Sequence, residues 1–233
     1  MSAELSGRPP RHAPLVFVDD IDGLGLERGD AHHLGRVLRI QAGEEVTAAD
    51  GAGAWRPCRW TGDGLEAAGE PRHEVVAEPA VTVALAPTKG ERPAWAVQKL
   101  TEIGVDRIVI VTAERSVVRW DAGRAGTHLD RLARVAREAA AQSRRSAIPP
   151  VEGPVPVAEM VASGAALAEP GGPPLSLRHP SVVVGPEGGW APDELHGAPT
   201  AGLGTTILRT ETAAVVAASL LVALRNGYIV VEE

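Results

Sequence analysis

The chain has 233 residues, of which 44% are hydrophobic, and its net charge is −7. This length suits one large domain or two small ones, and the hydrophobic share is enough for a buried core. The single cysteine, Cys58, excludes an internal disulfide and a cysteine-based zinc site. The N-terminal residues lack a signal-like apolar core, and the longest helical apolar run, 213–224, is too short to span a bilayer. The composition therefore predicts a soluble, cytoplasmic protein that has no membrane partner.

Residues 1–74 are predicted to form a small β-rich domain. Short strand-like segments alternate with glycine turns, which is typical of a small barrel. Within this domain Asp30 is expected to cap a short helix that runs on to Leu38. Trp55 and Trp60 are expected to lie in its core.

Residues 75–233 have a different pattern, which predicts an α/β domain. A strand at 81–86, a helix from Pro93 to about residue 103 and an apolar strand at 105–111 form a β-α-β unit. Gly104 suits the C-terminal cap of that helix. A second helix is expected from about residue 127 to 142, and residues 164–180, rich in Gly and Pro, are expected to form an irregular connection.

Positive charge is concentrated in the middle of the chain. Residues 1–72 carry 8 basic and 12 acidic side chains, residues 73–150 carry 12 and 9, and residues 151–233 carry 3 and 9. Eight arginines lie between Arg115 and Arg145. Arginine suits phosphate because its planar group donates two hydrogen bonds. The charge alone is equally consistent with a solvated helix face.

Two strand-loop-helix elements close the chain, at 182–190 and 203–213. In α/β enzymes the ligand site lies where strands end and helices begin. Neither loop has the spacing of a dinucleotide fingerprint or of a P-loop. The two loops are therefore the predicted ligand site, although glycines that merely make tight turns are an equal alternative on this pattern alone.

The residues of these loops resemble the ribosomal RNA small subunit methyltransferase E family, of the SPOUT class. The resemblance rests first on Gly185-Pro186-Glu187-Gly188-Gly189 and on residues 207–213. Other matches follow in the family's order: His32-His33-Leu34, Val37-Leu38-Arg39, Lys89-Gly90, Gln98-Lys99, residues 101–105, Arg115-Ser116 and residues 138–145. The chain departs from the family at Thr206, where an arginine is common, and at Trp190, where a smaller residue is frequent.

The resemblance implies a PUA-like β-barrel RNA-binding domain in residues 1–74 and a SPOUT-type α/β domain in residues 75–233, with a mostly parallel sheet and a trefoil knot. It implies a homodimer that uses S-adenosylmethionine to methylate N3 of a uridine in 16S ribosomal RNA, within the small ribosomal subunit. The alternatives are a SPOUT-type protein that binds RNA without turnover and a methyltransferase for a different nucleotide. The acidic total charge leaves a small-molecule α/β enzyme as a further rival.

The expected cofactor site consists of both loops, where glycines let the backbone approach the ligand. Leu203, Ile207 and Leu208 are expected to enclose the adenine. The expected cofactor-binding residues are Val184, Gly185, Pro186, Gly188, Gly189, Leu203, Gly204, Ile207, Leu208, Thr212 and Ala213.

Catalysis at a uracil imide needs loss of the N–H proton and stabilisation of charge on the carbonyls. Arg209 is the candidate for the electrostatic role because it stays charged. Glu187 or Glu211 would accept the proton or orient Arg209. For Glu211, compensation of the helix N-terminus, worth roughly 0.3–1 kcal/mol, is an equal alternative.

The expected RNA contacts are basic side chains spread over both domains. No metal site is expected, because His32 and His33 are remote from cysteine and from acidic clusters. The predicted RNA-binding residues are His32, Arg36, Arg39, Lys89, Arg115, Arg131, Arg134, Arg144 and Arg145.

Overall fold

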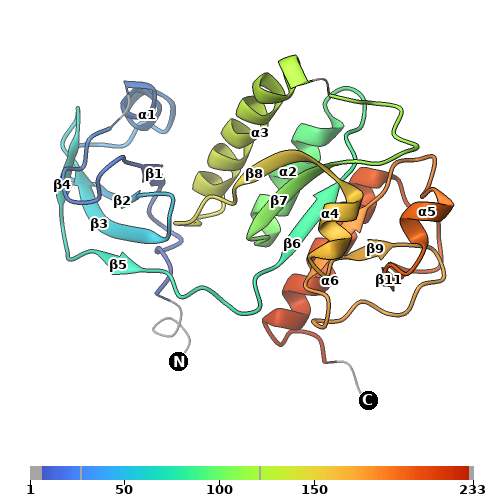
Figure 1. Cartoon of the computed structure of the whole chain (residues 1–233). Helices are drawn as coiled ribbons and strands as arrows, with labels where there is room; N and C mark the ends of the chain where they lie inside the picture. The colour runs from blue at the N-terminus through green and yellow to red at the C-terminus, as the bar shows by residue number, and fades with distance from the viewer. Residues whose placement is uncertain (1–6, 27, 121, 231–233) are drawn as a thin grey trace. The chain divides into compact units, whose positions relative to one another are not determined.

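The computed structural model describes residues 7–26, 28–120 and 122–230 (Figure 1). The chain divides into two compact units. The first unit ends at Val76 and also includes Arg137–Ile148, and the second consists of Ala77–Ala136 and the chain from Pro149 onward. The outer ends of the two predicted domains, at residues 1–6 and 231–233, lie outside the described residues.

The first unit contains a five-stranded sheet. Strand β1 is parallel to β2, whereas β3 pairs antiparallel with β2, β4 and β5. Trp55 and Trp60 are each only 3% exposed, which confirms that they are core residues. The strands are β1 Leu15–Phe17, β2 Glu45–Ala49, β3 Ala54–Trp60, β4 Leu65–Ala67 and β5 Arg72–His73.

The short helix of this unit differs from the prediction. Helix α1, Arg28–His32, continues into a π-helical turn, η1, at His33–Val37. Asp30 lies inside α1, so the expectation that it caps the helix was wrong. Its carboxylate instead accepts a hydrogen bond of 2.8 Å from Arg137, a tertiary contact that no local pattern indicates.

The second unit contains a six-stranded parallel sheet in the order β11-β9-β10-β6-β7-β8. This confirms the α/β fold class with a mostly parallel sheet. Because all strands run the same way, the loops after them meet along one edge. The strands are β6 Thr82–Leu85, β7 Arg107–Thr112, β8 Val151–Pro156, β9 Ala166–Ala168, β10 Ser181–Val184 and β11 Thr200–Ala201.

Helices cover both faces of this sheet (Figure 1). Helices α2 and α6 pack together, and α6 also contacts β6 and β10. Helix α4 contributes Val157 and Met160 to a separate core with Ala84, Val109 and Val183 of the strands. The helices are α2 Arg92–Ile103, α3 Ala122–Gln142, α4 Val157–Ala162, α5 Pro192–Leu195 and α6 Thr210–Arg225.

Local signals place α2 better than the elements that follow it. Pro93 lies in its first turn and Gly104 caps it with φ of 108°, as predicted. Helix α3 begins at Ala122, before the expected residue 127. Strand β9 lies inside the stretch 164–180, which was predicted to be irregular. The prediction missed it because a three-residue strand gives no periodic signal.

Among the described helices none is long and apolar enough to cross a bilayer. The trefoil knot stays a prediction.

Candidate active site

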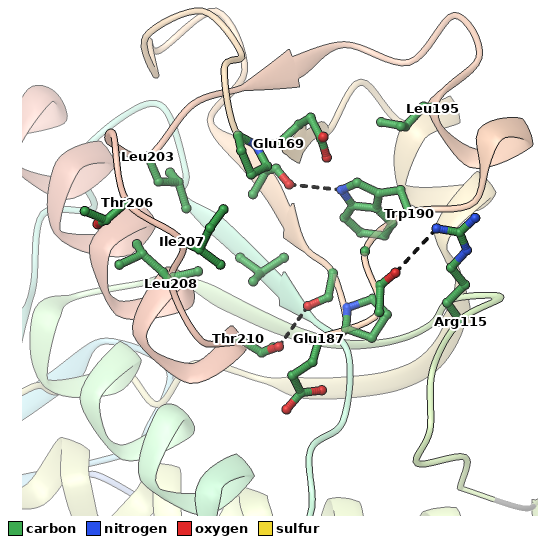
Figure 2. Close-up of a pocket in the computed structure, with 18 of the residues that line it drawn as sticks. Arg115, Glu169, Glu187, Trp190, Leu195, Leu203, Thr206, Ile207, Leu208 and Thr210 are labelled. Carbon is green, nitrogen blue, oxygen red and sulfur yellow. Dashed lines mark hydrogen bonds between the residues drawn. The ribbon is translucent and has the colours of Figure 1, made fainter.

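A cavity of about 430 Å³ lies in the second unit, at the carboxyl edge of its parallel sheet (Figure 2). Its lining comes mainly from the ends of three strands and the loops that follow them: residues 168–170 at the end of β9, 184–190 at the end of β10, and 203, 204 and 206–208 after β11. The other lining residues are Arg115 from the loop after β7, Leu195 at the end of α5, and Thr210 and Ala213 of α6. This is the position in which open α/β sheets bind their ligands.

The cavity brings together all the predicted cofactor-binding residues except Thr212. The glycine loop, residues 185–189, and the loop at 203–208 lie on two sides of it, as Figure 2 shows. Ile207 is 83% exposed at this cavity, an unusual position for a large apolar side chain unless a ligand covers it. The predicted residues that line it are Val184, Gly185, Pro186, Gly188, Gly189, Leu203, Gly204, Ile207, Leu208 and Ala213.

Trp190 packs against the glycine loop, residues 185–189, at Gly185. The side chain is 5% exposed, and its indole nitrogen donates a hydrogen bond of 2.9 Å to the carbonyl of Ala168 (Figure 2). A Cβ on Gly185 would lie 3.0 Å from the indole ring, so only glycine fits there without movement. Trp190 therefore links the loop after β10 to the end of β9 by a hydrogen bond.

Two further residues hold the site in shape, and the sequence did not single them out. The hydroxyl of Thr210 donates a 2.9 Å hydrogen bond to the carbonyl of Gly185, which joins α6 to the glycine loop (Figure 2). The carboxylate of Glu194 accepts bonds from the backbone N–H groups of Ala191, at 2.8 Å, and Glu114, at 2.9 Å. A glutamate at the third position of a helix can bond back to the N-cap backbone N–H, and this is the only local signal that could have indicated Glu194.

The three predicted catalytic residues have different environments. Glu187 lines the cavity, and its side chain is 48% exposed. Arg209 is the N-cap residue of α6 and is exposed; within the part of the chain that the structure describes, its side chain has no hydrogen bond or ion pair. Glu211 does not line the cavity, and its side chain is 12% exposed.

Arg92 connects the two carboxylates. One guanidinium nitrogen is 3.5 Å from Oε1 of Glu187, and Nε is 3.8 Å from Oε1 of Glu211. The other oxygen of Glu211 is buried and has no hydrogen-bond partner among the described residues. The sequence does not indicate Arg92, because no motif marks it and its role depends on a tertiary contact between α2 and α6.

The predicted RNA-binding residues are divided between the units. In the second unit Arg115 donates to the carbonyl of Gly188 at 3.4 Å, and Arg131 pairs with Glu91. In the first unit Arg144 bonds the carbonyl of Ala141 at 2.9 Å. Burial lowers the pKa of the Arg144 guanidinium. The second unit holds Lys89, Arg115, Arg131 and Arg134, and the first holds His32, Arg36, Arg39, Arg144 and Arg145.

The chain matches two family models of RNA methyltransferases. Residues 76–222 match the family model of the RNA methyltransferase domain, and residues 26–64 match that of the RNA methyltransferase PUA domain. Ribosomal RNA small subunit methyltransferase E of Mycobacterium bovis is 37% identical to the chain, in an alignment that covers 88% of this chain and 89% of the relative. The chain belongs to the ribosomal RNA small subunit methyltransferase E family.

Two solved structures agree with this assignment. The enzyme of Neisseria gonorrhoeae, bound to S-adenosyl methionine, is 29% identical, with a TM-score of 0.74 over 91% of this chain and 98% of its own. A probable rRNA-methyltransferase from Porphyromonas gingivalis is 28% identical, with a TM-score of 0.73 over 93% and 100%. The family resemblance, the PUA-like domain and the α/β class predicted from the sequence are confirmed.

No group of three or more His, Cys, Asp or Glu side chains within the described residues is arranged to hold a metal ion.

Proposed function

We propose that this protein methylates N3 of a uridine in 16S ribosomal RNA of the small ribosomal subunit, with S-adenosylmethionine as donor. The observation that carries the proposal is the cavity at the carboxyl edge of the sheet, lined by ten residues that the sequence assigned to the donor. Two facts about relatives support it: a relative that is 37% identical in sequence bears the name ribosomal RNA small subunit methyltransferase E, and a solved relative of that name is bound to S-adenosyl methionine.

The lining suits S-adenosylmethionine chemically. Leu203, Ile207 and Leu208 offer apolar surface to an adenine ring, and glycine backbone offers close N–H and C=O groups. Glu169 and Glu187 add carboxylates that suit the ribose hydroxyls and the positive charges of the donor. The bound donor supplies an activated methyl group on a sulfonium sulfur.

The side chains divide the remaining work. Glu187 is the better proton acceptor, because it lines the cavity and is about half exposed. Glu211 is mostly buried and faces Arg92, so it acts as a positioning residue for the first turn of α6. Arg209 lies in the chain between Leu208 and Thr210, which both line the cavity, and its role in the proposal is to stabilise negative charge on the uracil carbonyls.

The finer assignments of assembly and location belong to the same proposal. A homodimer follows from the family resemblance, and sedimentation of the purified protein tests it. Ribosomal RNA as substrate, together with a single buried thiol, Cys58, fits an enzyme that works in the cytoplasm.

Methyl transfer in vitro tests the activity. Purified protein is incubated with radiolabelled S-adenosylmethionine and either small ribosomal subunits or naked 16S RNA, and the RNA is digested to nucleosides. We expect label in 3-methyluridine. RNA binding without label would favour the non-catalytic alternative, and label in another nucleoside would favour the different-nucleotide alternative.

A further inference from the structure

A second cavity, of about 290 Å³, lies in the second unit beside the loop after β6. This volume is close to the lower end for small-ligand sites, about 300 Å³. None of its described lining residues is shared with the first cavity. It is lined by Thr88, Lys89, Gly90, Pro93, Val118, Arg119, Trp120, Arg124, His128, Arg131 and Leu132.

The charge of this lining is one-sided. It carries one lysine, three arginines and a histidine, and the described lining residues include no aspartate or glutamate. Arg131 pairs with Glu91 just outside the lining, and Arg119 donates to the carbonyl of Glu114 at 3.0 Å. Even with these contacts, the side chains of the lining carry more positive than negative charge, although the net charge of the whole chain is −7. The lining therefore suits an anion.

A buried hydroxyl points to a ligand independently of the charge. Thr88 is 5% exposed, and its hydroxyl is buried with no hydrogen-bond partner among the described residues. Buried polar groups nearly always have a partner, because an unmade hydrogen bond is costly. A ligand oxygen in the cavity would provide one.

An aromatic pair forms another part of the wall. The rings of Trp120 and His128 are stacked, with centroids 4.7 Å apart and an angle of 21° between their planes. Both residues line the cavity, so their rings form an aromatic part of its wall. Proteins that bind single-stranded RNA commonly use such aromatic surfaces to stack bases.

We propose that this second cavity holds one nucleotide of the RNA substrate, with its phosphate at Lys89, Arg119 and Thr88 and its base against Trp120. This inference rests on the proposed function, because the RNA in the second cavity is the RNA that receives the methyl group. Consecutive residues join the two cavities: Glu91 pairs with Arg131 of the second, and Arg92 pairs with Glu187 of the first. RNA held in the second cavity therefore lies next to the donor pocket.

Binding of 16S RNA to four variants tests the proposal: Thr88→Val, Thr88→Ser, Arg119→Ala and the control Arg178→Ala. Affinity for S-adenosylmethionine is measured in parallel by calorimetry. Thr88→Val and Arg119→Ala should each weaken RNA binding about tenfold, as expected for one lost hydrogen bond to a charged group. Arg119→Ala should also lower the salt slope by about 0.7, the value for one phosphate contact on a single strand. Thr88→Ser keeps the hydroxyl and should bind like the wild type. All four variants should keep wild-type donor affinity.

Arg178→Ala is the matched control, since Arg178 is exposed and precedes β10 at the opposite edge of the sheet. Arg119 is also exposed, so its variant is informative even if Thr88→Val folds poorly. Wild-type RNA affinity in both Arg119→Ala and a folded Thr88→Val protein, with an unchanged salt slope in Arg119→Ala, would overturn the proposal, while methyl transfer by the wild type would leave the proposed function intact.

Uridine 5′-monophosphate separates RNA from a free nucleotide as the occupant. We expect it to compete with RNA for the wild type at millimolar concentration and not to bind Arg119→Ala. Binding of the monophosphate that leaves RNA affinity unchanged would identify a free-nucleotide site and overturn the assignment to RNA.

Discussion

The guanidinium of Arg92 lies against the carboxylate of Glu211, with 3.8 Å between Nε and Oε1. The contact joins the start of α2 to the first turn of α6, and the same guanidinium faces Glu187 of the donor cavity. Glu211 therefore has a counter-charge supplied by another helix, in addition to the N-terminal end of its own helix. This relationship explains why a conspicuous carboxylate of the family motif does not line the cavity.

Arg92→Ala should lower the stability of the second unit slightly. Because Arg92 is 44% exposed, solvent screens the pair, and we expect a loss of about 1 kcal/mol or less. Glu211→Gln in the same background should recover most of that loss, since an amide needs no counter-charge. Denaturant unfolding of both single variants and the double variant measures the coupling. Additive losses would show that the two side chains do not interact.

Gly188→Val should weaken donor binding in a folded protein. A Cβ at this position would lie 3.2 Å from the backbone oxygen of Arg115 and 3.3 Å from its Cβ, so the glycine loop must move away. We expect a loss of about tenfold in affinity for S-adenosylmethionine by calorimetry, equivalent to about 1.4 kcal/mol. Gly126→Val is the control, because a Cβ there meets nothing within 4 Å. Equal affinities for the two variants would refute the placement of the donor in this loop.

Trp190 should matter for stability through one hydrogen bond as well as through its bulk. Trp190→Phe keeps most of the ring but leaves the carbonyl of Ala168 unpaired, which costs about 1–3 kcal/mol. Trp190→Ala also opens a void under Gly185 and should cost about 3–5 kcal/mol. Denaturant unfolding gives both values. A phenylalanine variant as stable as the wild type would mean that the hydrogen bond contributes nothing.

Arg209 should act in the chemical step. Removing a preorganised donor of this kind typically costs about 10²–10³ in turnover, and Arg209→Lys should also be impaired because it lacks the planar group. Single-turnover transfer at saturating donor and RNA isolates the step. If Arg209→Ala lowers only RNA affinity, the electrostatic role belongs to another residue, and Glu187 becomes the first candidate for catalysis.

Cys58 should be unreactive in the folded protein. The thiol is 1% exposed, and burial raises its pKa, so less thiolate is present at any given pH than in the unfolded chain. Alkylation by iodoacetamide at pH 8 should therefore be much slower without denaturant than with it. Equal rates would contradict the burial of Cys58.

The sequence revealed the parts of the site that local patterns encode. Glycines after an apolar strand mark a loop at the sheet edge, which is why Gly185, Gly188 and Gly204 were assigned to the pocket that they line. Contacts between distant segments carry no such mark. The hydrogen bond from Thr210 to Gly185 and the position of Arg92 depend on how α6 and α2 pack, and they emerge only in three dimensions.

The same distinction holds for the fold. Pro93 and Gly104 define helix α2 through backbone preferences of their own. Strand β9 is positioned by its pairing with β10 and β11 and by the burial of Leu167 in the core. Asp30 bonds to Arg137, which is more than a hundred residues away in the sequence. Neither outcome is visible in a short window of sequence.

Mass spectrometry of 16S ribosomal RNA from cells with and without this protein is the decisive test of the proposed methylation. We expect one 3-methyluridine to be absent from 16S RNA when the protein is removed, and the wild-type gene to restore it whereas Arg209→Ala restores much less. An unchanged content of 3-methyluridine in 16S RNA after removal of the protein would refute the proposed function.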